Sequence, residues 1–380
     1  MSGSPTGPNA VRDPRAARAP RVLLAGGGSA GHVSPLLATA ARIREQAPQA
    51  QIVVLGTASG LEADLVPAAG FELVTIEKVP FPRRPGGAAV RFPARLAGSV
   101  REVRALLRDR GINVVVGFGG YVCPPAYLAA AASRIPLVVH EANRRPGLAN
   151  RLGAVRAAAV LTALDGTRLR GARRIGMPMR EGIAHLDRAA RRDGAVQEFG
   201  LDPARPVLLV TGGSLGAQRL NDAVCEAAPT FLEAGAQILH ITGRGKAEDL
   251  TPRPGYRVVE YVRAMEDAYA AADLALTRSG AGTVCELTAV GLPAVLVPLP
   301  IGNGEQALNG QDVVSAGGAL MIEDAQITAA RLVEQVLPLL LDQERRAAMA
   351  AASRRFGIPD AAERLAEIVI GAAREPGRRL

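Results

Sequence analysis

The chain has 380 residues, of which 48% are apolar and only 3% aromatic, and its formal net charge is +9. This length suffices for two domains with buried cores, and apolar side chains that are mostly Ala, Val and Leu suit helices packed on parallel strands. The three cysteines are widely spaced, without a CxxC motif or a Cys/His cluster, which excludes a disulfide framework and a cysteine-based metal site.

The first 20 residues contain Gly, Pro, Arg and Ala but no apolar segment. We expect a disordered tail there (1–20) and no signal peptide. No run of the chain approaches the roughly 18 apolar residues that a membrane-spanning helix needs. We therefore expect a protein that is soluble or bound peripherally to a membrane.

The first predicted strand, Arg21–Ala25, runs into a glycine turn that is followed by a helix from about Pro35 to Gln46. The turn has the GxGxxG spacing of dinucleotide-binding proteins. The second strand, Gln51–Leu55, ends in Gly-Thr, although an NAD site needs an acidic residue there for the ribose. This absence argues against an NAD-dependent oxidoreductase. The turn still brings His32 to the carboxyl edge of the sheet, where it is a candidate catalytic base.

The segment from Lys78 to Arg110 contains nine basic and two acidic residues, a local excess of +7, and it ends in a helix predicted near Leu96–Arg110. Nucleic acid and anionic lipid are both possible partners, and a solvated arginine-rich helix is the simpler alternative. No aromatic stacking platform or RNA-binding motif accompanies the charge. Phe81 and Phe92, each beside a proline, are able to enter lipid headgroups. We therefore expect this segment to contact an anionic membrane surface, and we expect no nucleic-acid binding.

Polar side chains follow the next two predicted strands. Val114–Val116 opens into a second glycine turn that ends at Tyr121, and Leu137–Val139 leads directly into His140 and Glu141. Carboxyl ends of parallel strands share one edge of a sheet, so these groups are expected to converge there. His140 is the rival of His32 as the catalytic base.

A second βα series follows a hinge at Gly176–Arg180. Its first strand, Val207–Val210, ends in a third glycine turn, and further strands are predicted at Gln237–Thr242, Val258–Val259, Leu274–Leu276 and Ala294–Val297. The fold class is therefore α/β, with two doubly wound parallel-sheet halves facing a cleft between them.

The stretch from Ala272 to Gln306 has the pattern strand, small-residue turn, helix, strand. Bare backbone N–H groups and the helix dipole at the start of that helix favour a phosphate. Glu286 lies one turn further in and is suited to ribose hydroxyls, and Gln306 is suited to a sugar hydroxyl. No Asp-x-Asp motif for a metal occurs in the sequence, so helix N-termini and Arg180 would stabilise a leaving diphosphate.

Seven motifs in order resemble those of the MurG family, bacterial glycosyltransferases of peptidoglycan synthesis. They are GGGSAGHVSP (26–35), GFGGYVCPP (117–125), HEANRRPGLAN (140–150), GMPMR (176–180), TGGSLGAQRLN (211–221), TRSGAGTVCE (277–286) and the loop through Gln306. The resemblance implies the GT-B fold of two Rossmann-like domains. It also implies inverting transfer of N-acetylglucosamine from UDP-GlcNAc to the MurNAc C4 hydroxyl of lipid I, which yields lipid II without a cofactor or metal.

The resemblance also implies roles for residues that match the family motifs. His32, His140 and Glu141 are the catalytic candidates, and Tyr121 and Asn150 would lie near the acceptor. The residues expected to bind UDP-GlcNAc are Ser29, Ala30, Gly31, Asn143, Arg180, Ser214, Val262, Ala281, Gly282, Thr283, Val284, Cys285, Glu286 and Gln306.

These inferences divide the chain into an acceptor and membrane domain (21–178), a UDP-GlcNAc domain (179–358) and a last helix returning to the first domain (359–380). The expected location is the cytoplasmic face of the cell membrane. Two alternatives are an enzyme like UDP-GlcNAc 2-epimerase, which shares the fold, and a non-catalytic membrane-bound sugar-nucleotide sensor. The epimerase needs no lipid, so the basic segment argues against it, and a sensor would not need His32 in the cleft.

Overall fold

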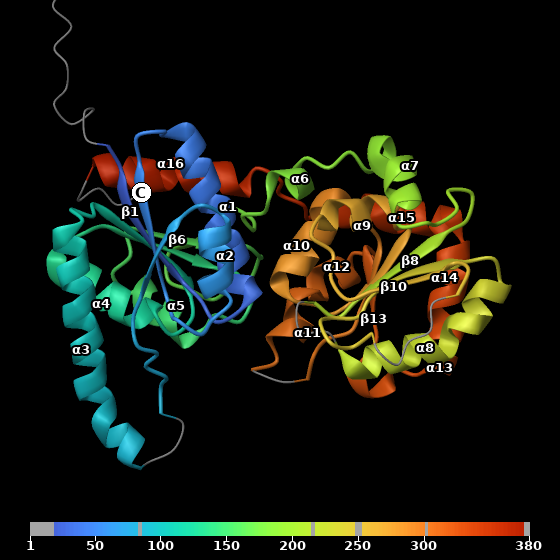
Figure 1. Cartoon of the computed structure of the whole chain (residues 1–380), viewed down its shortest axis with the longest axis horizontal. Coiled ribbons are helices and arrows are strands. Elements are labelled where there is room, and N and C mark those ends of the chain that lie inside the picture. The colour runs from blue at the N-terminus through green and yellow to red at the C-terminus, as the bar shows by residue number, and fades with distance from the viewer. Residues whose placement is uncertain (1–18, 83–85, 214–216, 248–252, 301–302, 376–380) are drawn as a thin grey trace, which may run out of the picture.

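Two α/β halves lie side by side in the computed structural model, each with helices around a parallel sheet (Figure 1). The structure describes residues 19–82, 86–213, 217–247, 253–300 and 303–375. Most of the predicted tail (1–20), together with Arg83, Arg84 and Ser214, therefore lies outside the described residues. The prediction of two doubly wound parallel-sheet domains is confirmed.

The first half contains a seven-stranded sheet with the order β3-β2-β1-β4-β5-β6-β7, and every pairing in it is parallel. Val, Leu and Ala fill the central strands because helices cover both faces of the sheet. Its strands are β1 (Arg21–Gly26), β2 (Gln51–Gly56), β3 (Glu72–Thr75), β4 (Val114–Gly119), β5 (Leu137–Glu141), β6 (Ala159–Thr162) and β7 (Ala172–Arg174). Its helices are α1 (Ala30–Gln46), α2 (Glu62–Ala68), α3 (Gly87–Asp109), α4 (Cys123–Ser133) and α5 (Leu148–Ala154).

The second half contains a six-stranded parallel sheet with the order β10-β9-β8-β11-β12-β13. The strands are β8 (Val207–Thr211), β9 (Gln237–Ile241), β10 (Tyr256–Val259), β11 (Leu274–Thr277), β12 (Ala294–Leu296) and β13 (Ala319–Met321). The helices are α6 (Glu181–Ala184), α7 (Arg188–Glu198), α8 (Gln218–Glu233), α9 (Met265–Ala271), α10 (Ala281–Val290), α11 (Glu305–Asn309), α12 (Gln311–Ser315), α13 (Ala329–Arg331), α14 (Leu337–Leu341) and α15 (Gln343–Arg354), with a 3-10 turn at Asp324–Gln326 and a π turn at Leu332–Val336.

The last helix, α16 (Ala361–Arg374), crosses from the second half and lies beside α1 of the first (Figure 1). Leu365, Ala366 and Val369 of this helix are fully buried in the same core as Leu24 and Leu36. Apolar burial of this kind contributes about 1.5–3 kcal/mol for a large side chain. The end of the chain is therefore part of the core of the first half.

Three elements differ from the sequence predictions near the site. Helix α1 begins at Ala30, five residues before Pro35, so His32 lies in its first turn. Strand β5 continues through His140 and Glu141, so both residues belong to the strand and not to the loop that follows it. Helix α3 begins at Gly87, nine residues before the predicted start at Leu96, and it contains Pro93. Arginine and proline interrupt the apolar periodicity of the first turns of α3, so the sequence pattern did not predict that these turns are helical.

Candidate active site

A cavity of about 1640 Å³ lies between the two halves. Both glycine turns of the first half line it, and so do the third glycine turn and the start of α10 in the second half. The carboxyl edges of both parallel sheets therefore face one space, as expected for ligand sites of doubly wound sheets. The predicted residues that line it are Ser29, Ala30, Gly31, His32, Tyr121, Glu141, Asn143, Asn150, Arg180, Val262, Ala281, Gly282, Thr283, Glu286 and Gln306.

Helix α1 brings His32 to the wall of the first half. Its N-cap residue, Ser29, has extended backbone and no side-chain capping bond, so the first N–H groups of the helix are open. The His32 Nδ1 atom lies 3.0 Å from Gly27 O and 3.2 Å from Ser29 Oγ. A Cβ atom at Gly119, whose φ is +110°, would lie 2.8 Å from His32 Nε2. Glycine at the end of β4 thus leaves room for the imidazole.

Helix α10 presents its N-terminus from the opposite wall. The N-cap residue is Gly280, which has no side chain that could cap the helix. The backbone N–H groups that follow are therefore open to an anion. Glu286 lies one turn further along, and Tyr269 Oη donates a hydrogen bond to its Oε2 at 2.7 Å. Burial raises the pKa of Glu286, against the opposing effect of that bond. Nothing in the apolar sequence around Tyr269 predicted this contact.

Polar groups around the cleft are held by further hydrogen bonds. Gln306 Oε1 accepts a bond from Leu299 N at 3.0 Å, which leaves its Nε2 group as the donor that it offers to a ligand. Arg180 Nη1 donates to Arg263 O at 3.1 Å. Both side chains are therefore oriented by the backbone of neighbouring loops.

Among the residues that the structure describes, three of the predicted site do not line the cavity. Val284 and Cys285 are 2% and 8% exposed and pack into the core of the second half. Their side chains therefore do not line the cleft. His140 is fully buried and does not line the cavity.

The expected position of the His140 side chain in the cleft requires a correction, because that side chain is fully buried although the residue lies next to the end of β5. Its Nε2 is 2.9 Å from Gly176 O, and its ring centroid is 5.9 Å from that of Phe118. Burial lowers the pKa of His140 to about 4, although the bond to Gly176 O opposes the shift. The imidazole is therefore neutral and inaccessible to a substrate in the cleft, and we assign it a structural role.

Glu141 faces the cleft edge, where its carboxylate holds the following loop. Oε1 accepts a bond from Asn143 N at 2.9 Å, and Oε2 accepts bonds from Gly147 N at 3.1 Å and Asn150 Nδ2 at 3.0 Å. Asn150 also accepts a bond from Tyr127 Oη at 2.7 Å. These bonds assign Glu141 to organising the loop 142–147 rather than to proton transfer.

The loop 142–147 also connects the two halves. Asn309 Nδ2 of α11 donates to Asn143 Oδ1 at 3.1 Å, and Arg144 N donates to Asn309 Oδ1 at 3.1 Å. Arg144 Nη1 lies 2.7 Å from Asp312 Oδ1. Asn143, which was predicted to bind the sugar nucleotide, thus takes part in a contact between the two halves that the sequence did not indicate.

The structural role of His140 predicts a pH dependence of stability. The folded imidazole stays neutral to about pH 4, whereas the unfolded one takes up a proton below about pH 6.5. The contribution of His140 to the free energy of unfolding is therefore fully present above pH 6.5. It falls as the pH drops toward 4, by about 1.4 kcal/mol for each pH unit. We expect His140→Gln, which keeps a donor for Gly176 O, to show a smaller loss of melting temperature between pH 7.5 and pH 5.

His240 is the matched control, because burial lowers its pKa to about 4 as well and it lies in the other half, bonded to Asn221 and Tyr256. His240→Gln should reduce the acid sensitivity of the second half instead. Folded His140→Gln should keep kcat within a few-fold. If His140→Gln lost as much kcat as a variant that lacks the catalytic base, His140 would have to be counted among the catalytic residues.

The fold and the cleft define a GT-B glycosyltransferase. Residues 22–162 match the model of the glycosyltransferase family 28 N-terminal domain, and residues 207–365 match that of the family 28 C-terminal domain. The crystal structure of Acinetobacter baumannii MurG is similar, with a TM-score of 0.75, 26% identity, and coverage of 92% of this chain and 99% of that one.

Two relatives carry the name UDP-N-acetylglucosamine--N-acetylmuramyl-(pentapeptide) pyrophosphoryl-undecaprenol N-acetylglucosamine transferase. The protein of Paenarthrobacter aurescens (strain TC1) is 55% identical, over 92% of this chain and 96% of the relative. The protein of Leifsonia xyli subsp. xyli (strain CTCB07) is 53% identical, over 91% and 97%. The chain therefore belongs to the MurG family of N-acetylglucosamine transferases.

Proposed function

We propose that this chain transfers N-acetylglucosamine from UDP-GlcNAc to the MurNAc C4 hydroxyl of undecaprenyl-diphosphate-MurNAc-pentapeptide (lipid I), giving lipid II in peptidoglycan synthesis. The observation that carries the proposal is the cleft itself. His32 lines its wall in the first half, and the open N-terminus of α10 lines the wall in the second half. The names and full-length similarity of the relatives supply the substrates.

The reaction is a single displacement at the anomeric carbon of the donor. The acceptor oxygen forms a bond to that carbon, while the bond to the diphosphate oxygen breaks and UDP leaves with the electron pair. The acceptor proton passes to His32, because a neutral imidazole has one unprotonated ring nitrogen that can accept it. Because attack comes from the face opposite to UDP, the configuration at the anomeric carbon inverts.

The UDP side needs a charge stabiliser and a ribose ligand. The N–H groups of Ala281, Gly282 and Thr283, together with the dipole of α10, suit the diphosphate, and Arg180 adds a positive charge at the cavity wall. Glu286, oriented by Tyr269, suits the ribose hydroxyls. Among the described residues, no cluster of three or more His, Cys, Asp or Glu side chains could hold a metal ion.

One assay tests the proposal against its alternatives. Purified protein is incubated with UDP-GlcNAc and a lipid I analogue, and the disaccharide product and free UDP are followed. The proposal requires both products in equal amounts. Conversion of UDP-GlcNAc without the acceptor would indicate epimerase chemistry, and tight UDP-GlcNAc binding without turnover would indicate a sensor.

We also propose that α3 and the loop before it hold the protein on the cytoplasmic face of an anionic membrane. Helix α3 projects beyond the sheet (Figure 1), and no helix in the described ranges is long and apolar enough to cross a bilayer. Phe81 is 41% exposed, its ring centroid lies 5.0 Å from that of Phe92, and nearby Val90 is 81% exposed. Apolar side chains beside the exposed Arg91 and Arg95 match a surface of lipid headgroups.

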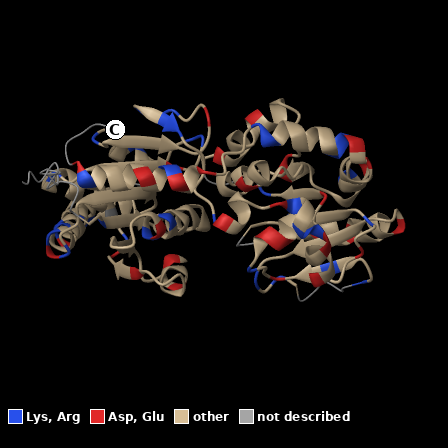
Figure 2. Ribbon diagram, turned by 90° about the horizontal axis from the view of Figure 1, so that it is seen from above, with Lys and Arg blue, Asp and Glu red and all other residues tan. Residues whose placement is uncertain are grey.

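Elsewhere in the molecule, charges of both signs are spread over both halves (Figure 2). The basic excess of the 78–110 segment is therefore local. We expect Arg91→Gln with Arg95→Gln to weaken binding to vesicles containing 30% anionic lipid by roughly 10- to 30-fold at low salt, because each arginine near the surface contributes about 1 kcal/mol.

The matched control is Arg345→Gln with Arg355→Gln, which removes the same charge from exposed positions of the second half. Its vesicle binding should stay within a few-fold of the parent protein. Turnover of a short-chain, water-soluble acceptor should be unchanged in both double variants. Equal loss of vesicle binding in the two would show that net charge, and not α3, attracts the membrane.

A further inference from the structure

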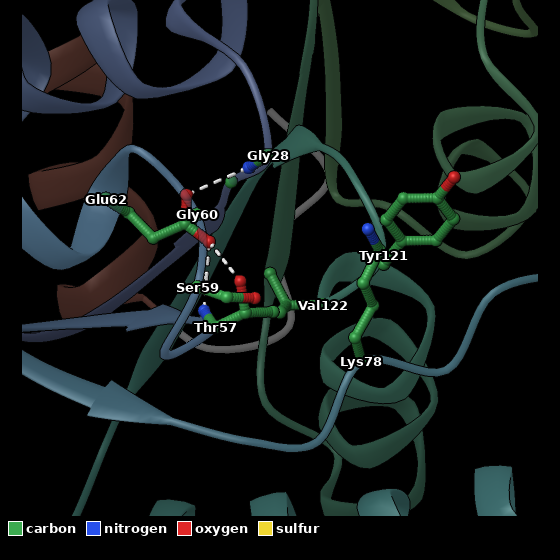
Figure 3. Close-up of a pocket in the computed structure, with 9 residues that line it drawn as sticks. Gly28, Thr57, Ser59, Gly60, Glu62, Lys78, Tyr121 and Val122 are labelled. Carbon is green, nitrogen blue, oxygen red and sulfur yellow. Dashed lines mark hydrogen bonds between the residues drawn. The ribbon is translucent and has the colours of Figure 1, made fainter.

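A buried carboxylate lies behind the first glycine turn. Glu62, the first residue of α2, is fully buried beside a small cavity that Lys78 also lines. Its Oε2 accepts a bond from Gly28 N at 2.9 Å, and its Oε1 accepts bonds from Thr57 N at 2.9 Å and Thr57 Oγ1 at 2.7 Å (Figure 3). Burial acts to raise the pKa of Glu62, but the bonds from Gly28 and Thr57 outweigh it and leave the pKa below its ordinary value. The group is therefore an anion at neutral pH.

The Gly28 N–H that Glu62 binds and the Gly27 C=O belong to the same peptide unit. That carbonyl oxygen lies 3.0 Å from His32 Nδ1. A carbonyl oxygen can only accept, so this contact requires the ring proton to be on Nδ1, which leaves Nε2 unprotonated. A hydrogen bond from the N–H of a peptide to an anion makes its carbonyl a stronger acceptor, since linked hydrogen bonds polarise one another.

The glycines around this peptide leave space for the arrangement. A Cβ atom at Gly27 or Gly60 would collide with the Glu62 carboxylate, and one at Gly120 would lie 2.5 Å from Gly27 O. Both glycine turns therefore close on the Gly27–Gly28 peptide, with Glu62 on one side and His32 on the other.

We propose that Glu62 is a positioning residue that acts through the Gly27–Gly28 peptide on His32. It holds the imidazole in the tautomer with Nε2 free to accept the acceptor proton, and it stabilises the imidazolium that forms. The arrangement is a carboxylate–imidazole pair with a peptide unit inserted between its members. The inference rests on the proposed function only in taking His32 as the base.

The first test needs no substrate. The chain has four histidines, so ¹⁵N-labelled imidazoles are few enough to assign by NMR. In the parent protein, the ¹⁵N shifts of neutral His32 should show a protonated Nδ1 and an unprotonated Nε2. Glu62→Gln, which removes the charge, should populate both neutral tautomers of His32, because the Gly27 carbonyl becomes a weaker acceptor for the Nδ1 proton.

A protonated Nε2 in the parent protein, or an unchanged His32 tautomer in folded Glu62→Gln, would overturn the inference. If Glu62→Gln does not fold, the tautomer of the parent protein decides alone. A negative result in this NMR test would leave the glycosyltransferase assignment intact. An absence of disaccharide product in the activity assay would contradict that assignment, but it would not change the tautomer observed for His32.

The second test is the pH profile of turnover. Glu62→Gln should lower kcat about tenfold and move the acid limb of kcat to lower pH, with little change in the KM for UDP-GlcNAc. Asp64→Asn, which removes the same charge from an exposed position of α2, should leave kcat and the acid limb unchanged. If the two variants changed kcat and the acid limb equally, the effect of Glu62→Gln would come from the loss of one negative charge near the site and not from the contact with the Gly27–Gly28 peptide.

Discussion

His32→Ala is expected to lower kcat by roughly 10²–10⁴-fold, the usual contribution of a positioned base. His32 lines the cleft in the first turn of α1, and its Nδ1 is held by Gly27 O. Removal of the imidazole leaves bulk water as the proton acceptor, whereas the proposed donor site at the N-terminus of α10 and Glu286 is unchanged. UDP-GlcNAc affinity, measured by calorimetry, should therefore change by less than about threefold.

His185→Ala is the matched control. That histidine is 54% exposed, does not line the cleft, and lies 3.6 Å from Glu363. Its kcat should equal that of the parent protein. Near-normal kcat in His32→Ala, measured with saturating lipid I analogue across pH 6–9, would remove His32 from the mechanism and require another base.

The second large effect concerns the donor. Glu286→Ala is expected to weaken UDP binding by roughly 10- to 100-fold, since hydrogen bonds to a charged group are worth about 1.5–3 kcal/mol. Loss should appear for UDP itself, because the proposed partner is the ribose and not the transferred sugar. Calorimetric titration with UDP, before any acceptor is added, measures it.

Glu226→Ala, the same substitution at an exposed position of α8, serves as the control and should bind UDP normally. Tyr269→Phe, which removes only the hydroxyl that donates to Glu286, should lose affinity by a few-fold. Unchanged UDP affinity in Glu286→Ala would move the ribose site elsewhere in the cleft.

The sequence by itself determined the architecture and the edge at which ligands bind. A strand of consecutive Val, Leu and Ala residues has apolar side chains on both faces, and both faces are buried when helices cover both sides of the sheet. Strands such as β1 and β8 were therefore predictable from the local sequence pattern. Each glycine turn follows such a strand directly. Since parallel strands of one sheet end at one edge, the turns at 26–31 and 117–120 had to lie on a common side of the first sheet, and the turn at 211–213 had to lie at the corresponding edge of the second sheet.

The tertiary structure alone decided which polar side chains at that edge reach a ligand. His32 and His140 both looked like strand-end histidines, but β5 continues two residues further and carries His140 into the core. No sequence pattern singled out Glu62, yet its carboxylate accepts a hydrogen bond from Gly28 N, 34 positions away in the chain. Register, strand length and long-range contacts set the direction of a side chain, and a local pattern carries no information about any of them.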